Sequence, residues 1–131
     1  MNLFKAAFTV LFLLLISPCF SQQNAKLDCS SSRSGKFKCL DAEDTTTYVI
    51  MNEEKQVSYS RLNPYTIESK IVWITDCSYN MEITKITIPD FPFKPGDVMN
   101  VVIDKVEGDI IYYTCTFKGM NGKGRFKKLD R

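Results

Sequence analysis

The cysteines are the residues of this chain with the clearest capacity for chemistry. The sequence contains five cysteines and no histidine. Four of the five follow the apolar N-terminal segment, namely Cys29, Cys39, Cys77 and Cys115. No two of these four have the close spacing of zinc ligands, so a zinc site is not expected. An even set of cysteines in a small exported chain indicates two disulfides instead, and four cysteines can pair in three ways.

The sequence offers no set of residues typical of a catalytic centre. Without histidine the usual general base at neutral pH is missing, and neither a Cys–His nor a Ser–His–Asp arrangement can form. Asp41, Glu43 and Asp44 form an acidic cluster, but it lacks the EF-hand spacing and lies in a predicted turn, so we expect solvated carboxylates rather than a calcium site. A glycosidase with two carboxylates is an alternative that no feature favours. We therefore predict no catalytic, cofactor-binding or metal-binding residues, and a protein that is not an enzyme.

The first 21 residues have the order of a secretory signal peptide. Lys5 supplies a positive charge, an apolar run follows over 6–16, and small Ser21 precedes a polar stretch. The run is shorter than the roughly 20 residues that a membrane-spanning helix needs, and no basic stop follows it. We expect cleavage after Ser21 and a secreted or periplasmic protein. Lipidation of Cys19 is the alternative that would tether the chain to a membrane, although Pro18 fits such a site poorly.

The charge of the chain excludes a general attraction to nucleic acid. Lys and Arg number 17 against 15 Asp and Glu, a formal net charge of +2, so we expect neither a nucleic-acid partner nor an anionic membrane surface. The last segment is locally basic, and we expect a solvated strand and tail there. A phosphate-binding stripe is the alternative, but Phe126 is the only aromatic residue close by. The basic residues of this segment are Lys118, Lys123, Arg125, Lys127, Lys128 and Arg131.

The pattern of apolar residues after position 34 has a period of two, which is typical of β-strands. Residues 22–34 form a polar N-terminal arm, and 35–131 form one β-barrel domain. Turns are expected at 42–45, 53–55, 78–80 and 107–109, and Gly119, Gly122 and Gly124 frame a last one. The predicted strands cover 35–41, 46–52, 56–62, 68–77, 81–88, 98–106, 110–118 and 125–129.

About eight short strands with short connections predict an all-β fold. Such strands close into an antiparallel up-and-down barrel or stack as a sandwich, and we favour the barrel because closure removes exposed strand edges. Phe37, Trp73 and Tyr113 lie on apolar strand faces and are the candidate residues to line a ligand cavity. Packing in the core is the alternative for each of them.

Three short motifs carry a family resemblance. They are Gly35-Lys36-Phe37, Tyr48-Val49-Ile50 and Trp73-Ile74-Thr75-Asp76-Cys77-Ser78-Tyr79. The chain resembles a group of small exported lipocalin-like β-barrel proteins common in Bacteroidetes, over most of 29–117. Some members are labelled DNA topoisomerase IV, an activity that does not fit an exported β domain without a nucleotide site or a carboxylate cluster for metal.

The resemblance implies a disulfide, and the pattern of eight alternating strands suggests a function class. Cys29 and Cys77 match the two cysteine positions of the group, so that pair is the expected disulfide. Cys39 and Cys115 would then pair with each other or remain buried thiols. We expect a monomeric, non-enzymatic barrel that binds a small apolar ligand or serves as an interaction module of the envelope. The alternative is a five-stranded OB-like barrel that binds nucleic acid or glycan through the basic C-terminal segment.

Overall fold

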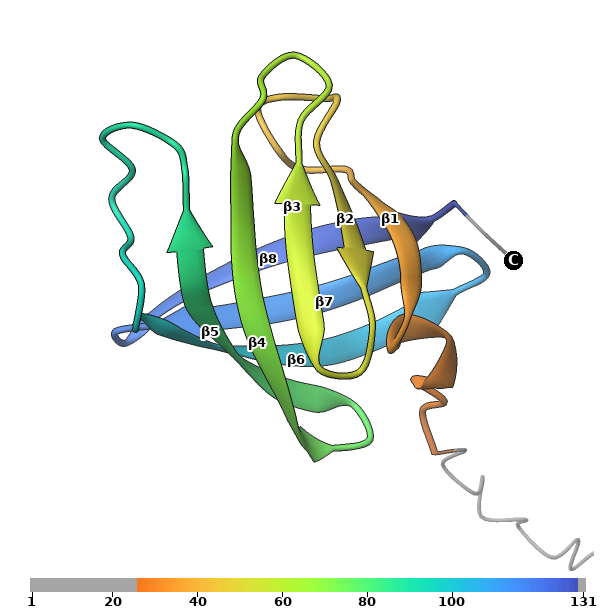
Figure 1. Cartoon of the computed structure of the whole chain (residues 1–131). Coiled ribbons are helices and arrows are strands. Elements are labelled where there is room, and N and C mark those ends of the chain that lie inside the picture. Colours follow the sequence, from red (N-terminus) through yellow and green to blue (C-terminus); the bar gives the residue numbers. More distant parts are fainter. Residues whose placement is uncertain (1–25, 130–131) are drawn as a thin grey trace, which may run out of the picture.

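The computed structural model describes residues 26–129. The predicted signal peptide and Cys19 lie outside the described residues. A short 3-10 helix, η1 (Ser30–Ser32), is followed by eight strands (Figure 1). They are β1 (Gly35–Cys39), β2 (Tyr48–Met51), β3 (Lys55–Tyr59), β4 (Thr66–Thr75), β5 (Ser78–Ile86), β6 (Val98–Glu107), β7 (Ile110–Phe117) and β8 (Met120–Lys128).

The eight strands form one closed antiparallel barrel in sequence order. Closure comes from β8, which pairs with β1 through Phe37↔Lys128 and Cys39↔Phe126. In Figure 1, β2, β3 and β4 cross in front of β6, β7 and β8, so the barrel has two faces that run crosswise. The prediction of an up-and-down barrel of about eight strands is confirmed. The five-stranded OB-like alternative is wrong about the fold.

The alternation of side chains builds the core inside this barrel. Because successive residues of a strand point to opposite faces, one side chain in two is directed inward. Phe37 is fully buried, and its ring lies 5.9 Å from that of Phe126 across the β1–β8 seam. The buried core consists of Cys29, Phe37, Val49, Met51, Ile71, Tyr79, Val101, Ile103, Ile111 and Phe126.

Two predicted turns are wrong in position. The turn expected at 78–80 lies instead at Asp76 and Cys77, and β5 begins at Ser78. The Thr75 hydroxyl bonds to Ser78 Oγ at 2.8 Å and accepts the Cys77 N–H at 3.2 Å, which holds this tighter turn. The strand then continues because Tyr79, only 2% exposed, pairs with Trp73 at a ring distance of 4.7 Å.

The glycine-rich segment before residue 125 is also a strand rather than a turn. A two-residue turn at Lys118 and Gly119, both with positive φ, already connects β7 to β8. Gly124 then lies within β8 opposite Tyr113, whose ring occupies the space that a Cβ at Gly124 would need. The glycine therefore makes room for an aromatic side chain, which sequence composition does not distinguish from a turn.

No helix within residues 26–129 is both long enough and apolar enough to span a membrane.

Candidate functional site

The barrel has two ends that differ in their connections. At one end, the arm end, lie residues 26–34 and the short β2–β3, β4–β5 and β6–β7 turns. At the other end, the loop end, lie the connections 40–47, 60–65, 87–97 and 118–119. This arrangement follows from the up-and-down topology, since alternate connections lie at opposite ends of an antiparallel barrel.

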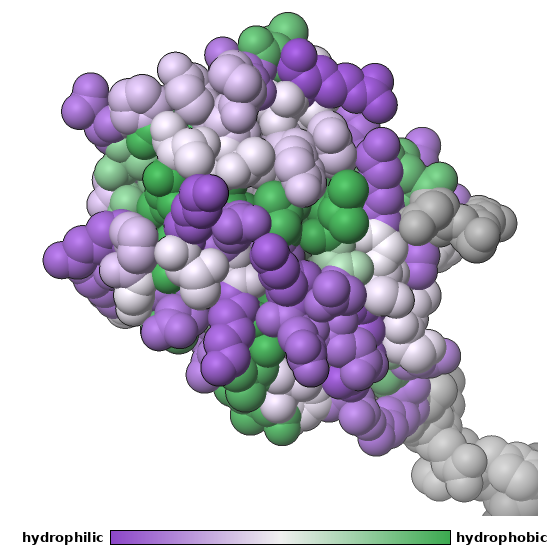
Figure 2. Space-filling view, viewed as in Figure 1, coloured by the Kyte–Doolittle hydropathy of each residue, from purple (hydrophilic) through white to green (hydrophobic). Residues whose placement is uncertain are grey.

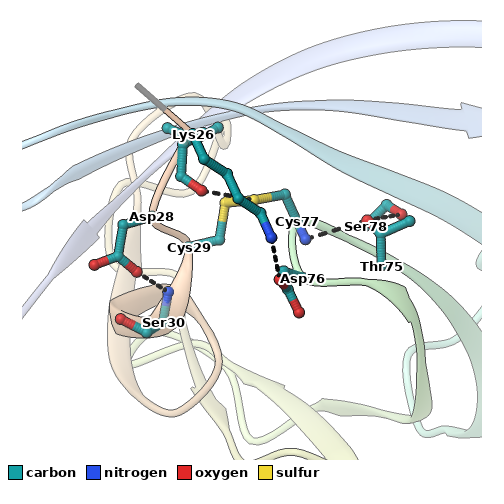
Figure 3. A network of polar contacts seen from close by, with 9 residues as sticks. Lys26, Asp28, Cys29, Ser30, Thr75, Asp76, Cys77 and Ser78 are labelled. Atoms are coloured by element: carbon teal, nitrogen blue, oxygen red, sulfur yellow. Dashed lines mark hydrogen bonds and ion pairs between the residues drawn. A yellow bond between two sulfur atoms is a disulfide. The ribbon is translucent and has the colours of Figure 1, made fainter. Parts of the chain in front are cut away.

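A disulfide ties the N-terminal arm across the arm end. Cys29 is bonded to Cys77 in the β4–β5 turn, with the two Cα atoms 5.4 Å apart, which confirms the predicted pair. Figure 3 shows the arm lying beside this turn, with Lys26 Nζ 2.9 Å from Asp76 Oδ2. Lys128 of β8 donates to the backbone carbonyls of Ser31 at 2.8 Å and Ser34 at 3.2 Å. The arm end is therefore closed by covalent and polar contacts.

Two of the three predicted ligand-lining residues belong to this closed end. Phe37 is completely buried in the core. Trp73 packs against the core, and the Arg33 guanidinium from the arm lies 4.2 Å from its ring centroid. The structure thus places both residues where other side chains of the protein surround them.

Tyr113, the third of these residues, lies farther from the arm. Its ring stacks on that of Phe126 at 4.6 Å, and burial raises the pKa of its hydroxyl above the ordinary value. It also borders an open groove of about 520 Å³ whose other lining residues are Asp41, Asp104, Lys105, Tyr112, Lys123, Gly124 and Arg125. In this groove Arg125 is held by Asp41, with Nη2 and Oδ1 2.8 Å apart. Of the three predicted ligand-lining residues, Tyr113 therefore has a groove beside it.

Cys39 and Cys115 are free thiols directed into the barrel. Of the two alternatives left open by the sequence, a second disulfide or two unpaired thiols, the structure has the unpaired thiols. Strand β8 separates them: Cys39 pairs with Phe126 and Cys115 with Gly122, four residues apart along that strand. Four residues of strand span roughly 13 Å, whereas disulfide-bonded Cα atoms lie within about 7 Å of each other. Burial raises the pKa of Cys39 to about 11 and that of Cys115 above its ordinary value. Both thiols are therefore protonated at neutral pH and weakly nucleophilic.

The loop end holds a cavity with two inward-facing strand residues, Ser58 and Ile67, in its wall. Its volume is about 420 Å³, and we call it the mouth cavity. Ser58 and Ile67 are cross-strand partners on the inward face of β3 and β4, in register with core residue Val49. The mouth cavity is lined by Glu43, Asp44, Thr47, Ser58, Tyr59, Ser60, Asn63, Tyr65, Ile67 and Ile88.

Inward side chains near this cavity remain partly exposed. On β4, Ile67 is half-buried whereas Ile71, four residues nearer the arm end, is only 4% exposed. The same difference separates Met99 at the loop end of β6 from Ile103 in the middle of that strand. Apolar side chains that face the interior without being covered by it are typical of a binding cavity.

Hydrogen bonds order the polar rim of the mouth cavity. The Asp44 carboxylate accepts hydrogen bonds from the Ser60 hydroxyl, from Thr46 N at 2.8 Å and from Thr46 Oγ1 at 2.6 Å. These bonds, with that of Ser60 as the main cause, lower the pKa of Asp44. The rim therefore carries an ionised, pre-oriented carboxylate. Of the other residues of the predicted acidic cluster, Asp41 accepts a hydrogen bond from Arg125. Among residues 26–129, no group of three or more His, Cys, Asp or Glu side chains is placed to hold a metal ion.

The sequence did not predict that two polar residues of β3 face the barrel interior. Gln56 and Ser58 point inward, while Val57 and Tyr59 point outward, because register with β2 places Gln56 opposite Met51. Gln56 is 6% exposed, and its Oε1 accepts no hydrogen bond from residues 26–129. The alternation of Val57 and Tyr59 with serines gave no sign that the polar members face the interior.

The predicted basic C-terminal segment does not act as one unit. Lys128 donates a hydrogen bond to the N-terminal arm, and Arg125 is paired with Asp41, whereas Lys123 and Lys127 are exposed. Arg131 lies outside the described residues.

Comparison with family models, curated proteins and solved structures found no match to this chain.

Proposed function

We propose that this protein is an exported, non-enzymatic lipocalin-like barrel that binds a small, mainly apolar ligand in the mouth cavity. The observation that carries the proposal is the mouth cavity itself, which has an inward apolar side chain in its wall. This residue, Ile67 of β4, is only partly buried, whereas Ile71 in the middle of the same strand is 4% exposed. An eight-stranded barrel is wide enough to hold one small ligand.

The lining indicates the chemistry of that ligand. Ile67 and Ile88 supply apolar contact, and the hydroxyls of Ser58 and Tyr65 supply a few polar contacts. Deeper on the same inward face of β3, the buried Gln56 Oε1 lacks a protein donor, and a buried acceptor left without a partner destabilises the fold. A ligand with an apolar body and one hydrogen-bond donor at its inner end fits this arrangement.

Binding of N-phenyl-1-naphthylamine tests the proposal, because this neutral fluorophore has an apolar body and a single N–H. We expect saturable fluorescence enhancement with the native chain. Ile67→Trp should fill the cavity and weaken binding at least tenfold. The matched control is Ile50→Trp, since Ile50 lies outside the barrel with 48% exposure. Equal binding by both variants, or no saturable binding by the native chain, would contradict the proposal.

Export needs a separate test. The disulfide and the signal-like N-terminus support secretion or a periplasmic location. When the full sequence is expressed in a host with a periplasm, the exported protein should begin at Gln22. Incorporation of labelled palmitate that disappears in Cys19→Ser would favour the lipidated form instead.

The interaction version of the prediction has its own candidate surface. Val72 and Ile74 on the outer face of β4, and Val102 on β6, are 53%, 56% and 39% exposed. In Figure 2, hydrophobic residues appear on this side of the molecule as separate green areas among hydrophilic ones. If the mouth cavity binds no apolar probe, this outer face becomes the better candidate for function.

A further inference from the structure

Basic side chains gather on one side of the barrel exterior. Strands β8, β1, β2 and β3 are consecutive around the barrel, and none of the four contains Asp or Glu. By contrast, β4, β5 and β6 each carry side chains of both signs. The basic residues of the four acid-free strands are Lys36, Lys38, Lys55, Lys123, Arg125, Lys127 and Lys128. The strands on this side are therefore uniformly basic, and the acidic residues near them lie in the connections 40–47 and 52–54.

Two lysines lie directly opposite each other at the seam that closes the barrel. Lys38 of β1 pairs with Lys127 of β8, and both are exposed. Like charges at opposed positions of an antiparallel pair are destabilising. No ion pair within residues 26–129 engages either lysine. Closure of the barrel does not require these charges, so a role in binding accounts for them better than a role in folding.

An aromatic pair lies beside this seam. Tyr48 of β2 and Tyr59 of β3 are cross-strand partners whose rings stack at 5.3 Å. Strand β1 lies on the other side of β2 from Tyr59, and its Lys36 Nζ lies 4.6 Å from the Tyr48 centroid. The Arg61 guanidinium lies 6.0 Å from the same centroid. We call the set Lys36, Lys38, Tyr48, Tyr59, Arg61 and Lys127 the basic face.

A groove runs through the basic face. It has a volume of about 350 Å³ and lies among Lys38, Tyr48 and Arg61. The rest of its wall consists of Thr45, Thr46, Thr47 and Leu129. An anionic group in this groove would lie between two cations from different elements and beside threonine hydroxyls. Cations here recur about 5 Å apart across strands and about 7 Å apart along them. This spacing suits a chain whose anionic groups repeat at short intervals.

We propose that the basic face binds an acidic polysaccharide. Single-stranded nucleic acid is the other polyanion to consider, but its binding relies on open aromatic faces on which bases stack. Tyr48 already stacks on Tyr59, and the Lys36 ammonium lies 4.6 Å from its ring centroid. The face therefore offers cations and hydroxyl groups rather than a stacking platform. This inference is independent of the ligand in the mouth cavity.

Isothermal titration of the mature chain with polygalacturonate at low and at moderate salt tests the proposal. We expect saturable binding that weakens as salt rises, and no binding of neutral dextran. Lys38→Gln combined with Lys127→Gln should raise the Kd at least fivefold. The matched control, Lys85→Gln with Lys94→Gln, removes the same charge from two exposed lysines on the other side of the barrel and should change the Kd less than twofold.

Three results would overturn the proposal. Equal weakening by the two double variants would mean that net charge alone attracts the polymer. Tighter binding of oligothymidylate than of polygalacturonate would assign the face to nucleic acid. Absence of binding to any polyanion would leave the face without this role. Thermal unfolding of each variant verifies that the lysine changes leave the barrel folded.

Discussion

The two ends of the barrel show how one alternating pattern produces two different interiors. At the arm end, inward residues such as Phe37 and Ile71 are at most 4% exposed, and a disulfide-linked arm covers them. At the loop end, Ile67 and Met99 point inward from the same set of strands yet stay half-exposed. The connections differ as well: a disulfide fixes the arm at one end, whereas the loop 87–97 at the other end packs Phe93 against Phe117 without a covalent link.

Truncation of a phenylalanine at each end should give the largest contrast. Phe37→Ala removes a fully buried ring and should lower the free energy of unfolding by about 3–5 kcal/mol. Phe117→Ala should have less than half that effect, since Phe117 is half-buried and packs at 4.7 Å on the loop residue Phe93. Urea titration measures both values. If Phe37→Ala does not fold, Phe37→Leu replaces it, and an equal loss at the two ends would contradict the comparison.

Removal of the disulfide should come next in size. Cys29→Ser with Cys77→Ser frees the arm and should cost about 2–4 kcal/mol. The native chain should lose a similar amount when a reductant is added, whereas the double variant should not respond. Cys39→Ala retains the disulfide and is the control for loss of a cysteine. A native chain whose urea midpoint is the same with and without reductant would show that the arm contributes little.

Thiol labelling tests how open the interior is at the loop end, where the free thiol of Cys39 lies. With the pKa of Cys39 near 11, the thiolate fraction at pH 8 is about 100-fold below that of a thiol with the ordinary pKa near 9. We expect iodoacetamide to label Cys39 at least tenfold more slowly in the folded chain than in urea, with a rate that rises up to about pH 11. Cys39→Ser identifies its share of the label. A folded-state rate equal to that in urea would mean that the loop-end interior is far more open than the structure indicates.

Low pH should lower the stability of the fold through Asp44 at the rim of the mouth cavity, by less than the changes described above. The pKa of Asp44 is lower in the folded chain than in the unfolded one, so its stabilising effect is present above pH 4 and is lost as pH falls through the folded value. Asp44→Asn should therefore reduce the drop in Tm between pH 7 and pH 3 by a few degrees. Glu43→Gln, at an exposed position of the same loop, is the control. An unchanged drop in Asp44→Asn would show that the hydrogen bonds of this carboxylate do not order the rim.

Strand periodicity predicted much more of the fold than of the candidate site. The eight strands follow from local alternation, and the resemblance of Cys29 and Cys77 to a known pattern led to the correct disulfide. The mouth cavity could not be predicted in the same way. It depends on Ser58 facing inward, and that orientation is imposed by register with β2 rather than by any property of β3.

The sequence by itself determined the number of strands, because the alternation of side chains is a local property. It also contains the signal-like segment on which the predicted export depends. Only the tertiary structure decided that Cys39 and Cys115 stay apart, because β8 is inserted between their strands. It also decided which end of the barrel is packed and where the cations of β8 and β1 meet. These features depend on pairing between residues far apart in the chain, and such pairing is settled when the barrel closes.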